Sequence, residues 1–291
     1  MLYQLKNEKL TITIEDLGAQ LRSIKSADGT EYLWQGDDQI WADQAPNLFP
    51  HIARLTTGHY TLEGKTYEMK SHGFAKDTVF TVEQESDSHI LFTIKADETT
   101  LAQYPYQFAF GVDYRLEGGK LLITYIVENK DQKEMYFGVG GHPGFNVPLE
   151  SGLAFEDYYL EFDCVKEALL VGMSEDCYVQ GENVKFPLEE GKKLNLKHNC
   201  FDHDAIILTD MCRAVTLKSD KNSRAVKLTY PDMGYLGIWH RPFTTAPYVC
   251  IEPWTSLPAR KGVVEDFSTQ PTMLTLEAGA RYENEYSIEI F

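Results

Sequence analysis

Apolar and polar residues alternate along much of this chain with a period of two. The stretch Leu10-Thr-Ile-Thr-Ile14 shows the pattern and is rich in β-branched residues. Such alternation is typical of a strand with one buried face. The other strands predicted from the same kind of pattern are 89–94, 108–116, 121–127, 158–162, 205–208, 214–217, 225–230 and 286–290.

Tight turns join some of these runs into hairpins. Glu117-Gly-Gly-Lys120 connects 108–116 to 121–127, and Glu63-Gly64 connects 60–62 to 65–67. Glycine at these positions is typical of two-residue hairpin loops. Turn signals recur every 8–12 residues or so, as in sandwiches and barrels. We expect little helix beyond a short piece at 97–103, because no long segment has a period of 3.6 residues.

Nothing in the sequence divides the chain. It has no linker-like tract, no low-complexity segment and no repeat of 20–50 residues. All-β sandwiches of roughly this length commonly form one unit. We therefore predict a single all-β domain over residues 1–291.

Charge narrows the range of partners. Acidic residues outnumber basic ones by 44 to 27, which gives a formal charge of −17 with neutral histidines. A surface of this kind repels nucleic acid and anionic lipid, so we expect neither as a partner. No apolar run reaches the roughly 18 residues of a membrane helix. The first ten residues, MLYQLKNEKL, lack a signal-peptide core, and a cytoplasmic protein is expected.

The cysteines do not indicate a disulfide framework or a zinc site. Their number is odd and no pair has CxxC spacing, so we expect reduced thiols. The five positions are Cys164, Cys177, Cys200, Cys212 and Cys250.

Four stretches place polar side chains among glycine, proline and aromatic residues. They are NLFPHIARL at 47–55, SHGFAKD at 71–77, GGHPGFNVPL at 140–149 and YVCIEPWT at 248–255. In the third, glycines and Pro143 would fix the backbone and direct the imidazole of His142 into a cavity. In the fourth, Glu252 follows an apolar run, where burial would raise its pKa and suit it to act as a general base.

Each of these residues also has a structural interpretation. Glu252 would then be a helix cap or a member of a salt bridge, and His142 and His72 would be turn histidines bonded to carbonyl groups. Arg54 would anchor a carboxylate of the fold instead of reaching a ligand oxygen. The residues alone leave both interpretations open.

Other chemistries find less support. The histidines and Glu252 do not have the spacing of a metal motif, and GxSxG is absent. Cys250 lies in an apolar strand pattern, where a buried, inert thiol is the default. Gly138-Val-Gly-Gly141 does not match a dinucleotide-binding loop. We therefore expect no metal and no organic cofactor.

Taken together and in this order, the four stretches resemble the aldose 1-epimerase (galactose mutarotase-like) family, in the branch of LacX-type proteins and hexose-6-phosphate 1-epimerases. The resemblance covers essentially the whole chain. It implies an antiparallel β-supersandwich with a sugar cleft on a concave face. It also implies that His142 and Glu252 form an acid–base pair, and that His72 and Arg54 hold the sugar.

The family also has an aspartate that binds sugar hydroxyls at the head of a short strand. Asp202 and Asp204 both fit that place, and Asp204 is preferred because an apolar strand follows it at once. Lys76 stands where this branch usually has arginine and is a further candidate for substrate binding. Lysine lacks the bidentate geometry of arginine, which weakens the case for tight phosphate binding.

The predicted function is interconversion of the α and β anomers of a hexose or hexose phosphate by acid–base ring opening and closure. We expect His142 and Glu252 to face one another across a gap the size of a sugar, with Trp34, Phe145 or Trp254 stacking on its apolar face. The alternative is a sugar-binding or sugar-sensing protein without turnover. A glycosidase would usually need a second carboxylate. The sequence does not indicate the oligomeric state.

Overall fold

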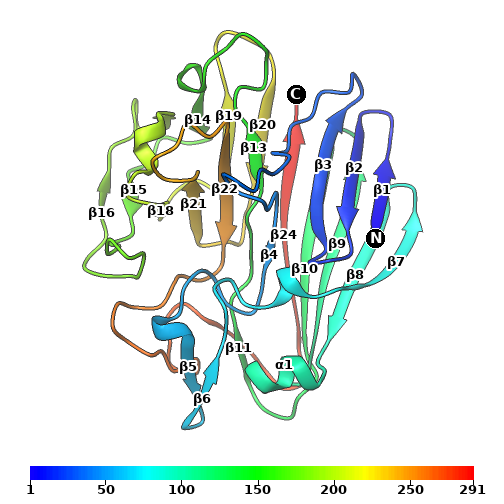
Figure 1. The fold of residues 1–291 in the computed structure, drawn as a ribbon, viewed down its shortest axis with the longest axis vertical. Helices are drawn as coiled ribbons and strands as arrows, with labels where there is room; N and C mark the ends of the chain where they lie inside the picture. The colour runs from blue at the N-terminus through cyan, green and yellow to red at the C-terminus, as the bar shows by residue number, and fades with distance from the viewer.

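The computed structural model describes residues 1–291, and strands dominate it. The largest sheet has nine strands, paired antiparallel. In spatial order they are β17 (Lys193–Asn195), β14 (Tyr159–Phe162), β19 (Ala214–Lys218), β20 (Ala225–Thr229), β24 (Arg281–Ile290), β10 (Lys120–Asn129), β9 (Phe108–Glu117), β8 (His89–Lys95) and β7 (Thr81–Ser86). In Figure 1 its long members, β24 and β8 to β10, run side by side.

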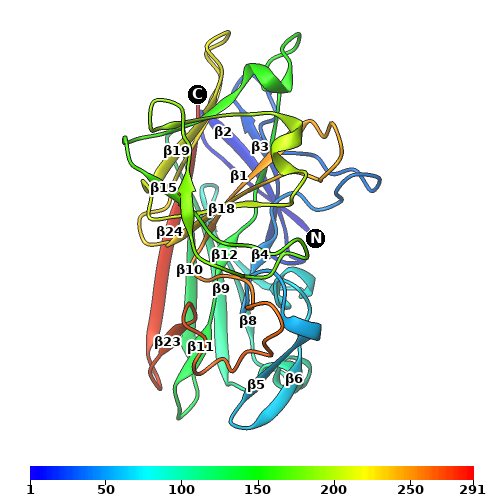
Figure 2. The ribbon, with the colours of Figure 1, turned by 90° about the vertical axis from the view of Figure 1, so that its left-hand side faces the viewer.

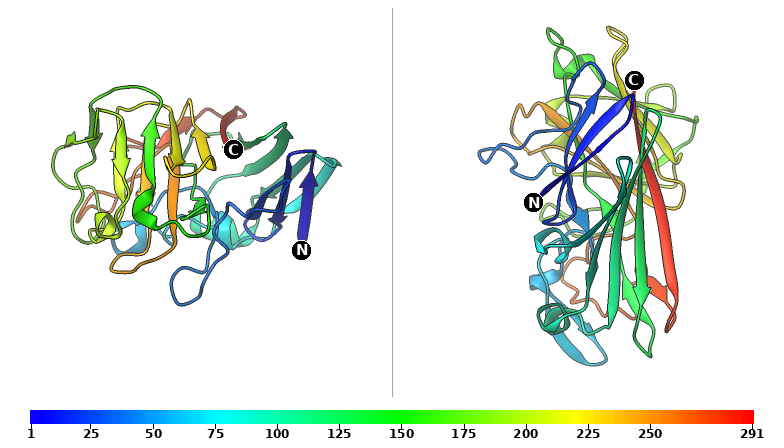
Figure 3. Two further views of the ribbon diagram at one scale, coloured as in Figure 1. Left: turned by 90° about the horizontal axis from the view of Figure 1, so that it is seen from above. Right: turned by 90° about the vertical axis from the view of Figure 1, so that its right-hand side faces the viewer.

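A second sheet of eight strands contains parts of three of the four stretches that the sequence singled out. Its order is β16 (Val184–Phe186), β15 (Ala168–Leu170), β18 (Ile206–Thr209), β21 (Tyr235–Trp239), β22 (Tyr248–Trp254), β12 (Gly140–Gly141) and β4 (Asn47–Leu48), and β13 (Gly144–Asn146) also pairs with β22. In the view from above (Figure 3, left), the blue strands near the N-terminus and the green and orange strands of the second sheet lie on opposite sides of the molecule.

Smaller elements complete the fold. A three-stranded sheet holds β1 (Leu2–Lys6), β2 (Leu10–Glu15) and β3 (Gln20–Ser26), and the two remaining pairs are β5 (His59–Leu62) with β6 (Lys65–Glu68) and β11 (Met135–Phe137) with β23 (Leu274–Leu276). The helical pieces are α1 (Glu98–Gln103), η1 (Thr56–Gly58), η2 (Ala75–Asp77), η3 (Phe155–Asp157) and η4 (His198–Phe201). Figure 2 shows the β5–β6 hairpin at the end of the molecule away from the C-terminus.

Local sequence explains these elements well. In β10 every second residue is buried, so one face of the strand packs on the core. Both predicted hairpins are confirmed, with Gly64 and Gly118 in the left-handed region at φ 74° and 58°. The predicted helix at 97–103 is also confirmed, and the Asp97 side chain caps it by accepting from the Thr100 amide at 2.8 Å.

One hydrophobic cluster of 65 buried residues forms the core between the sheets. It includes Leu5 near the start of the chain and Ile288 near its end. The prediction of one domain over residues 1–291 is compatible with this core and stays a prediction. No helix is both long and apolar enough to cross a membrane.

The expectation of five reduced cysteines was wrong for one pair. Cys164 and Cys212 form a disulfide, with their Cα atoms 5.9 Å apart. Cys164 follows β14 and Cys212 precedes β19, and these antiparallel neighbours bring the two residues together from 48 positions apart. Spacing along the sequence cannot reveal a pairing that strand register creates. The other three cysteines are free.

Candidate active site

Strand register places the two predicted catalytic residues side by side. Gly140 is paired with Trp254 and Gly144 with Cys250, so His142, midway between the glycines, lies opposite Glu252. On the other side of β22, Gly237 pairs with Glu252. A Cβ at Gly237 would lie 3.0 Å from two ring carbons of Trp254 and 3.3 Å from Cβ of Glu252, so this glycine leaves room for the Trp254 ring.

The strand that carries His142 is interrupted where the histidine stands. The amides of Ile251 and Thr255 in and after β22 donate to the carbonyls of Pro143 and Val139. Pro253 falls between these two donors and has no N–H to give. The proline therefore coincides with the gap between β12 and β13. The apolar run before Glu252 suggests that the residue lies at the end of a buried strand, and β22 continues past it through Pro253 to Trp254.

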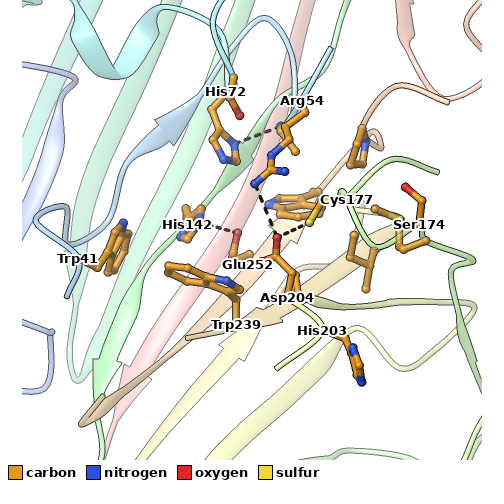
Figure 4. Close-up of a pocket in the computed structure, with 17 residues that line it drawn as sticks. Trp41, Arg54, His72, His142, Ser174, Cys177, His203, Asp204, Trp239 and Glu252 are labelled. Atoms are coloured by element: carbon orange, nitrogen blue, oxygen red, sulfur yellow. Dashed lines mark hydrogen bonds and ion pairs between the residues drawn. The ribbon is translucent and has the colours of Figure 1, made fainter. Parts of the chain in front are cut away.

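His142 and Glu252 are in direct contact. The Nε2 atom of His142 lies 3.1 Å from Oε2 of Glu252, and the side chains are 11% and 1% exposed (Figure 4). The expectation that they face each other across a sugar-sized gap was wrong. A hemiacetal carries both of its oxygens on one carbon, so the groups that serve those oxygens must be neighbours. The cavity lies beside the pair.

Burial shifts both groups towards their neutral forms. Desolvation lowers the pKa of His142 from 6.5 to about 3, and the charge of Lys76 acts in the same direction. Desolvation raises the pKa of Glu252 well above 4.5, helped by the negative charge of Asp204. The pair therefore holds one proton between a neutral imidazole and a carboxylic acid. The 3.1 Å contact is not aligned as a hydrogen bond, so Glu252 Oε2 has no hydrogen-bond partner, and neither has His142 Nδ1.

Aromatic rings surround the imidazole. Trp41 lies at a ring-centroid distance of 5.1 Å from His142 and Trp239 at 5.7 Å, while His72 approaches edge-on at 5.5 Å. Figure 4 shows Trp41 and Trp239 on the side of the pair away from Arg54. These rings exclude water from His142, which is the physical basis of its lowered pKa.

His72 is held by a strained turn. Its φ is 67° and that of Gly73 is 74°, both in the left-handed region. A Cβ on Gly73 would lie 2.1 Å from the Phe49 carbonyl oxygen, so only glycine fits there. The amide of Ala53 donates to Nδ1 of His72 at 3.1 Å, and desolvation lowers the pKa of this histidine. The neutral ring must then carry its proton on Nε2, as a donor.

Arg54 and Asp204 form the polar side of the cavity. Nη2 of Arg54 is 3.9 Å from Oδ2 of Asp204, and Nη1 donates to the Asp176 carbonyl at 3.0 Å. The thiol of Cys177 donates to the same Asp204 oxygen at 2.5 Å. These contacts tie the loop before β16 to the head of β18 and set the direction of the Asp204 carboxylate (Figure 4).

The cavity has a volume of about 220 Å³. Its walls come from β18, β21, β22 and the loops that end near them. The 17 lining residues are Trp41, Ala53, Arg54, Ser71, His72, His142, Met173, Ser174, Cys177, His203, Asp204, Ala205, Ile207, Trp239, Glu252, Trp254 and Pro258. This size suits one small molecule.

Five of the seven predicted site residues line this cavity, and two do not. Asp202 lies outside, where its carboxylate accepts from the Phe243 amide at 3.2 Å. Lys76 also lies outside, 3.3 Å from a carboxylate oxygen of Asp77 and 3.9 Å from one of Asp43. Asp204 is therefore the aspartate that we retain, and Lys76 acts on the site through its charge.

The sequence pointed to only one of the three tryptophans in the wall. Trp254 lines the cavity, whereas Trp34 and Phe145 do not. Trp41 and Trp239 were missed because no motif in the sequence around either residue indicates a site. Cys177 was missed for the same reason, since its loop meets Asp204 only in the folded chain.

Comparison with known proteins identifies the family. The family model for aldose 1-epimerase matches residues 1–289. The chain belongs to the aldose 1-epimerase family. Membership places it among carbohydrate epimerases, which act on sugars, and the resemblance inferred from the four motifs is confirmed.

Two similar relatives are the plasmid and chromosomal LacX proteins of Lactococcus lactis subsp. lactis. Each is 36% identical to this epimerase-family chain over 265 residues, which cover 88% of this chain and 88% of the relative. The match therefore extends over almost the full length of both proteins.

Solved structures of the family have the same fold. A galactose mutarotase related enzyme from Lactobacillus acidophilus is 34% identical, with a TM-score of 0.96 over 100% of this chain and 97% of that one. A galactose mutarotase-like protein from Lactobacillus casei ATCC 334 is also 34% identical, with a TM-score of 0.95 and full coverage of both chains. The predicted all-β, mutarotase-like fold is thus confirmed.

A more distant likeness supports the fold alone. A galactose mutarotase-like protein from Clostridium acetobutylicum is 19% identical, with a TM-score of 0.79 over 99% of this chain and 94% of that one. The fold has therefore been kept while most residues changed.

Proposed function

We propose that this protein interconverts the α and β anomers of an unphosphorylated hexose. The observation that carries the proposal is the buried contact between His142 and Glu252 at the edge of a small cavity. Ring opening needs one group that takes a proton and one that gives a proton, at two oxygens bonded to the same carbon. Binding alone needs no such pair.

The pair starts with one proton, which either group can hold. When Glu252 holds it, the carboxyl group gives it to the ring oxygen while His142 takes the proton of the C1 hydroxyl. The bond between C1 and the ring oxygen breaks, and C1 becomes an aldehyde. Rotation about C1–C2 exposes the other face, and the same transfers in reverse close the ring. The opposite assignment of acid and base follows if the proton starts on His142.

The other polar groups of the cavity would hold the sugar. Arg54 would donate hydrogen bonds to the sugar hydroxyl groups and Asp204 would accept from them. Nε2 of His72 would be a second donor.

The charges in and around the cavity favour an uncharged sugar. Arg54 is the one cation among the lining residues when the histidines are neutral, and Asp204 balances it. Lys76 and Lys70 both approach Asp77 at 3.3 Å. A phosphate dianion would have to displace these carboxylates, which would cost binding free energy.

Polarimetry on freshly dissolved α-anomers tests the proposal. His142→Ala and Glu252→Gln should each lower the turnover number by at least ~10², the low end for acid–base catalysis. Arg54→Ala and His72→Ala should mainly raise KM, because these residues position the sugar. Near-wild-type turnover in either catalytic variant would contradict the assignment, and inactivity of the wild type on every sugar would leave a binding protein.

The substrate class is read in the same assay. Glucose, galactose and tagatose should give higher kcat/KM values than their 6-phosphates, by about tenfold or more. The reason is that the cations near the cavity are already paired with carboxylates and do not attract a phosphate group. Higher values for the 6-phosphates would contradict the charge argument while leaving the acid–base pair intact.

A further inference from the structure

A free thiol lies next to the acid–base pair, in a small apolar cluster with Trp34 and Tyr248, and the proposed reaction does not use it. β22 presents alternate residues on one face, so Cys250 and Glu252 point to the same side of the sheet. Cys250 is fully buried, is not disulfide-bonded and makes no hydrogen bond through its Sγ. We infer that Cys250, His142 and Glu252 form an inhibitory site for a soft divalent cation of the Zn²⁺ class.

The three side chains converge as metal ligands do. One ligand atom from each lies within 4.8 Å of the other two. Tetrahedral Zn²⁺ separates N, O and S ligands by roughly 3.3–3.8 Å. The 3.1 Å between His142 and Glu252 already approaches that spacing, so the thiol has about 1 Å to move.

The glycine opposite Cys250 makes room for an aromatic ring of the site. Gly144 pairs with Cys250, and a Cβ there would lie 2.8 Å from a ring carbon of Trp41, but at an ordinary contact distance of 3.4 Å from Sγ. An ion reaches the site through the cavity, because His142 and Glu252 belong to its wall.

The donor set selects the metal. A thiolate, an imidazole and a carboxylate suit Zn²⁺ and Cd²⁺, whereas Mg²⁺ and Ca²⁺ prefer oxygen ligands alone. Three protein ligands leave a fourth position for water. On binding, the thiol and the Glu252 carboxyl each release a proton to solvent, and the metal takes their places.

Metal binding would remove both catalytic groups at once. The Glu252 carboxylate and the His142 nitrogen become ligands and can no longer exchange a proton with a sugar. The ion is thus an inhibitor, and chelators should leave turnover intact or raise it.

Isothermal titration calorimetry with Zn²⁺ and absorbance titration with Cd²⁺ test this inference without relying on turnover. The wild-type protein should bind one ion and show the ultraviolet band of a cadmium–thiolate bond. Cys250→Ser and Cys250→Ala should each weaken binding by at least about tenfold and lose the band. Cys200→Ser, a change of a free thiol in η4, should bind like the wild type.

Polarimetry adds the functional readout. Zn²⁺ should inhibit the wild type and the Cys200→Ser variant, and Mg²⁺ should inhibit neither, while the Cys250 variants should resist Zn²⁺. Unchanged Zn²⁺ affinity in both Cys250 variants, or no cadmium–thiolate band in the wild type, would overturn the inference. Failure of the proposed epimerase reaction would instead leave the metal-binding results in place.

Discussion

At the scale of single residues, the site depends on two buried groups that share one proton. In water the imidazole would titrate near 6.5 and the carboxyl group near 4.5, so at neutral pH Glu252 would have no proton to give. Burial reverses the order of these pKa values, since it disfavours every charged form. The carboxyl group then holds the proton that it would give to the ring oxygen, and the neutral imidazole is free to take the proton of the C1 hydroxyl.

This reversal predicts an unusual pH profile. The pKa of His142 is lowered to about 3, so its ring stays neutral well below pH 6.5. The pKa of Glu252 is raised, so its proton stays in place above pH 4.5. We expect kcat/KM, measured by polarimetry against the uncatalysed rate, to be flat between about pH 5 and pH 7. An acid limb centred near 6.5 would show that His142 titrates like an exposed imidazole.

At the scale of elements, two breaks in regular structure place the side chains. The interruption between β12 and β13 places His142 opposite β22. Pro253 of β22 faces this interruption, and because proline has no N–H, no backbone donor is left unpaired there. The turn at His72 and Gly73 has positive φ at both residues and packs under the Phe49 carbonyl. Strain at such turns persists because the surrounding packing fixes it.

The turn can be tested with a matched pair of variants. Gly73→Ala places a Cβ 2.1 Å from the Phe49 oxygen at φ 74°, so we expect it to lower the free energy of unfolding by about 2–4 kcal/mol and to raise KM by moving His72. Gly64→Ala has the same φ of 74° with no atom within 4 Å, and should cost about 1 kcal/mol.

Urea denaturation measures both variants, and polarimetry measures their KM. Equal losses of stability would mean that backbone strain alone matters and that the carbonyl of Phe49 moves aside freely. An unchanged KM in a folded Gly73→Ala protein would separate the turn from sugar binding.

At the scale of the whole molecule, two sheets enclose a large core, and the eight-stranded sheet forms the wall of the cavity. The site lowers the free energy of unfolding, because it keeps the carboxyl group of Glu252 buried. The raised pKa of Glu252 means that the native state binds more protons than the unfolded state above pH 4.5. By linkage, this residue makes the protein less stable as pH rises.

Replacing Glu252 by glutamine should therefore trade activity for stability. We expect Glu252→Gln to melt at a higher temperature than the wild type at pH 8, by about 2 °C or more, and the difference to shrink towards pH 4.5. Scanning calorimetry measures this difference. Glu83→Gln, at an exposed position of β7, is the matched control and should show no such trend. A gap that does not change with pH would mean that Glu252 is ionised in the folded protein.

The sequence by itself determined the strands, the hairpins and the residues with chemical potential. Alternation in 121–127 and glycine at 64 and 118 are local signals, and local backbone and burial preferences are enough to interpret them. The four motifs identified the family and named His142, Glu252, His72, Arg54 and Asp204 before any distance was known.

Only the tertiary structure decided how these residues meet. It put His142 against Glu252 instead of across a gap, brought Trp41 and Cys177 to the cavity, left Lys76 among carboxylates and joined Cys164 to Cys212. Each of these outcomes depends on strand register or on loops that are distant in sequence. Pairing between strands fixes which side chains are neighbours, and a one-residue change of register would alter all of them.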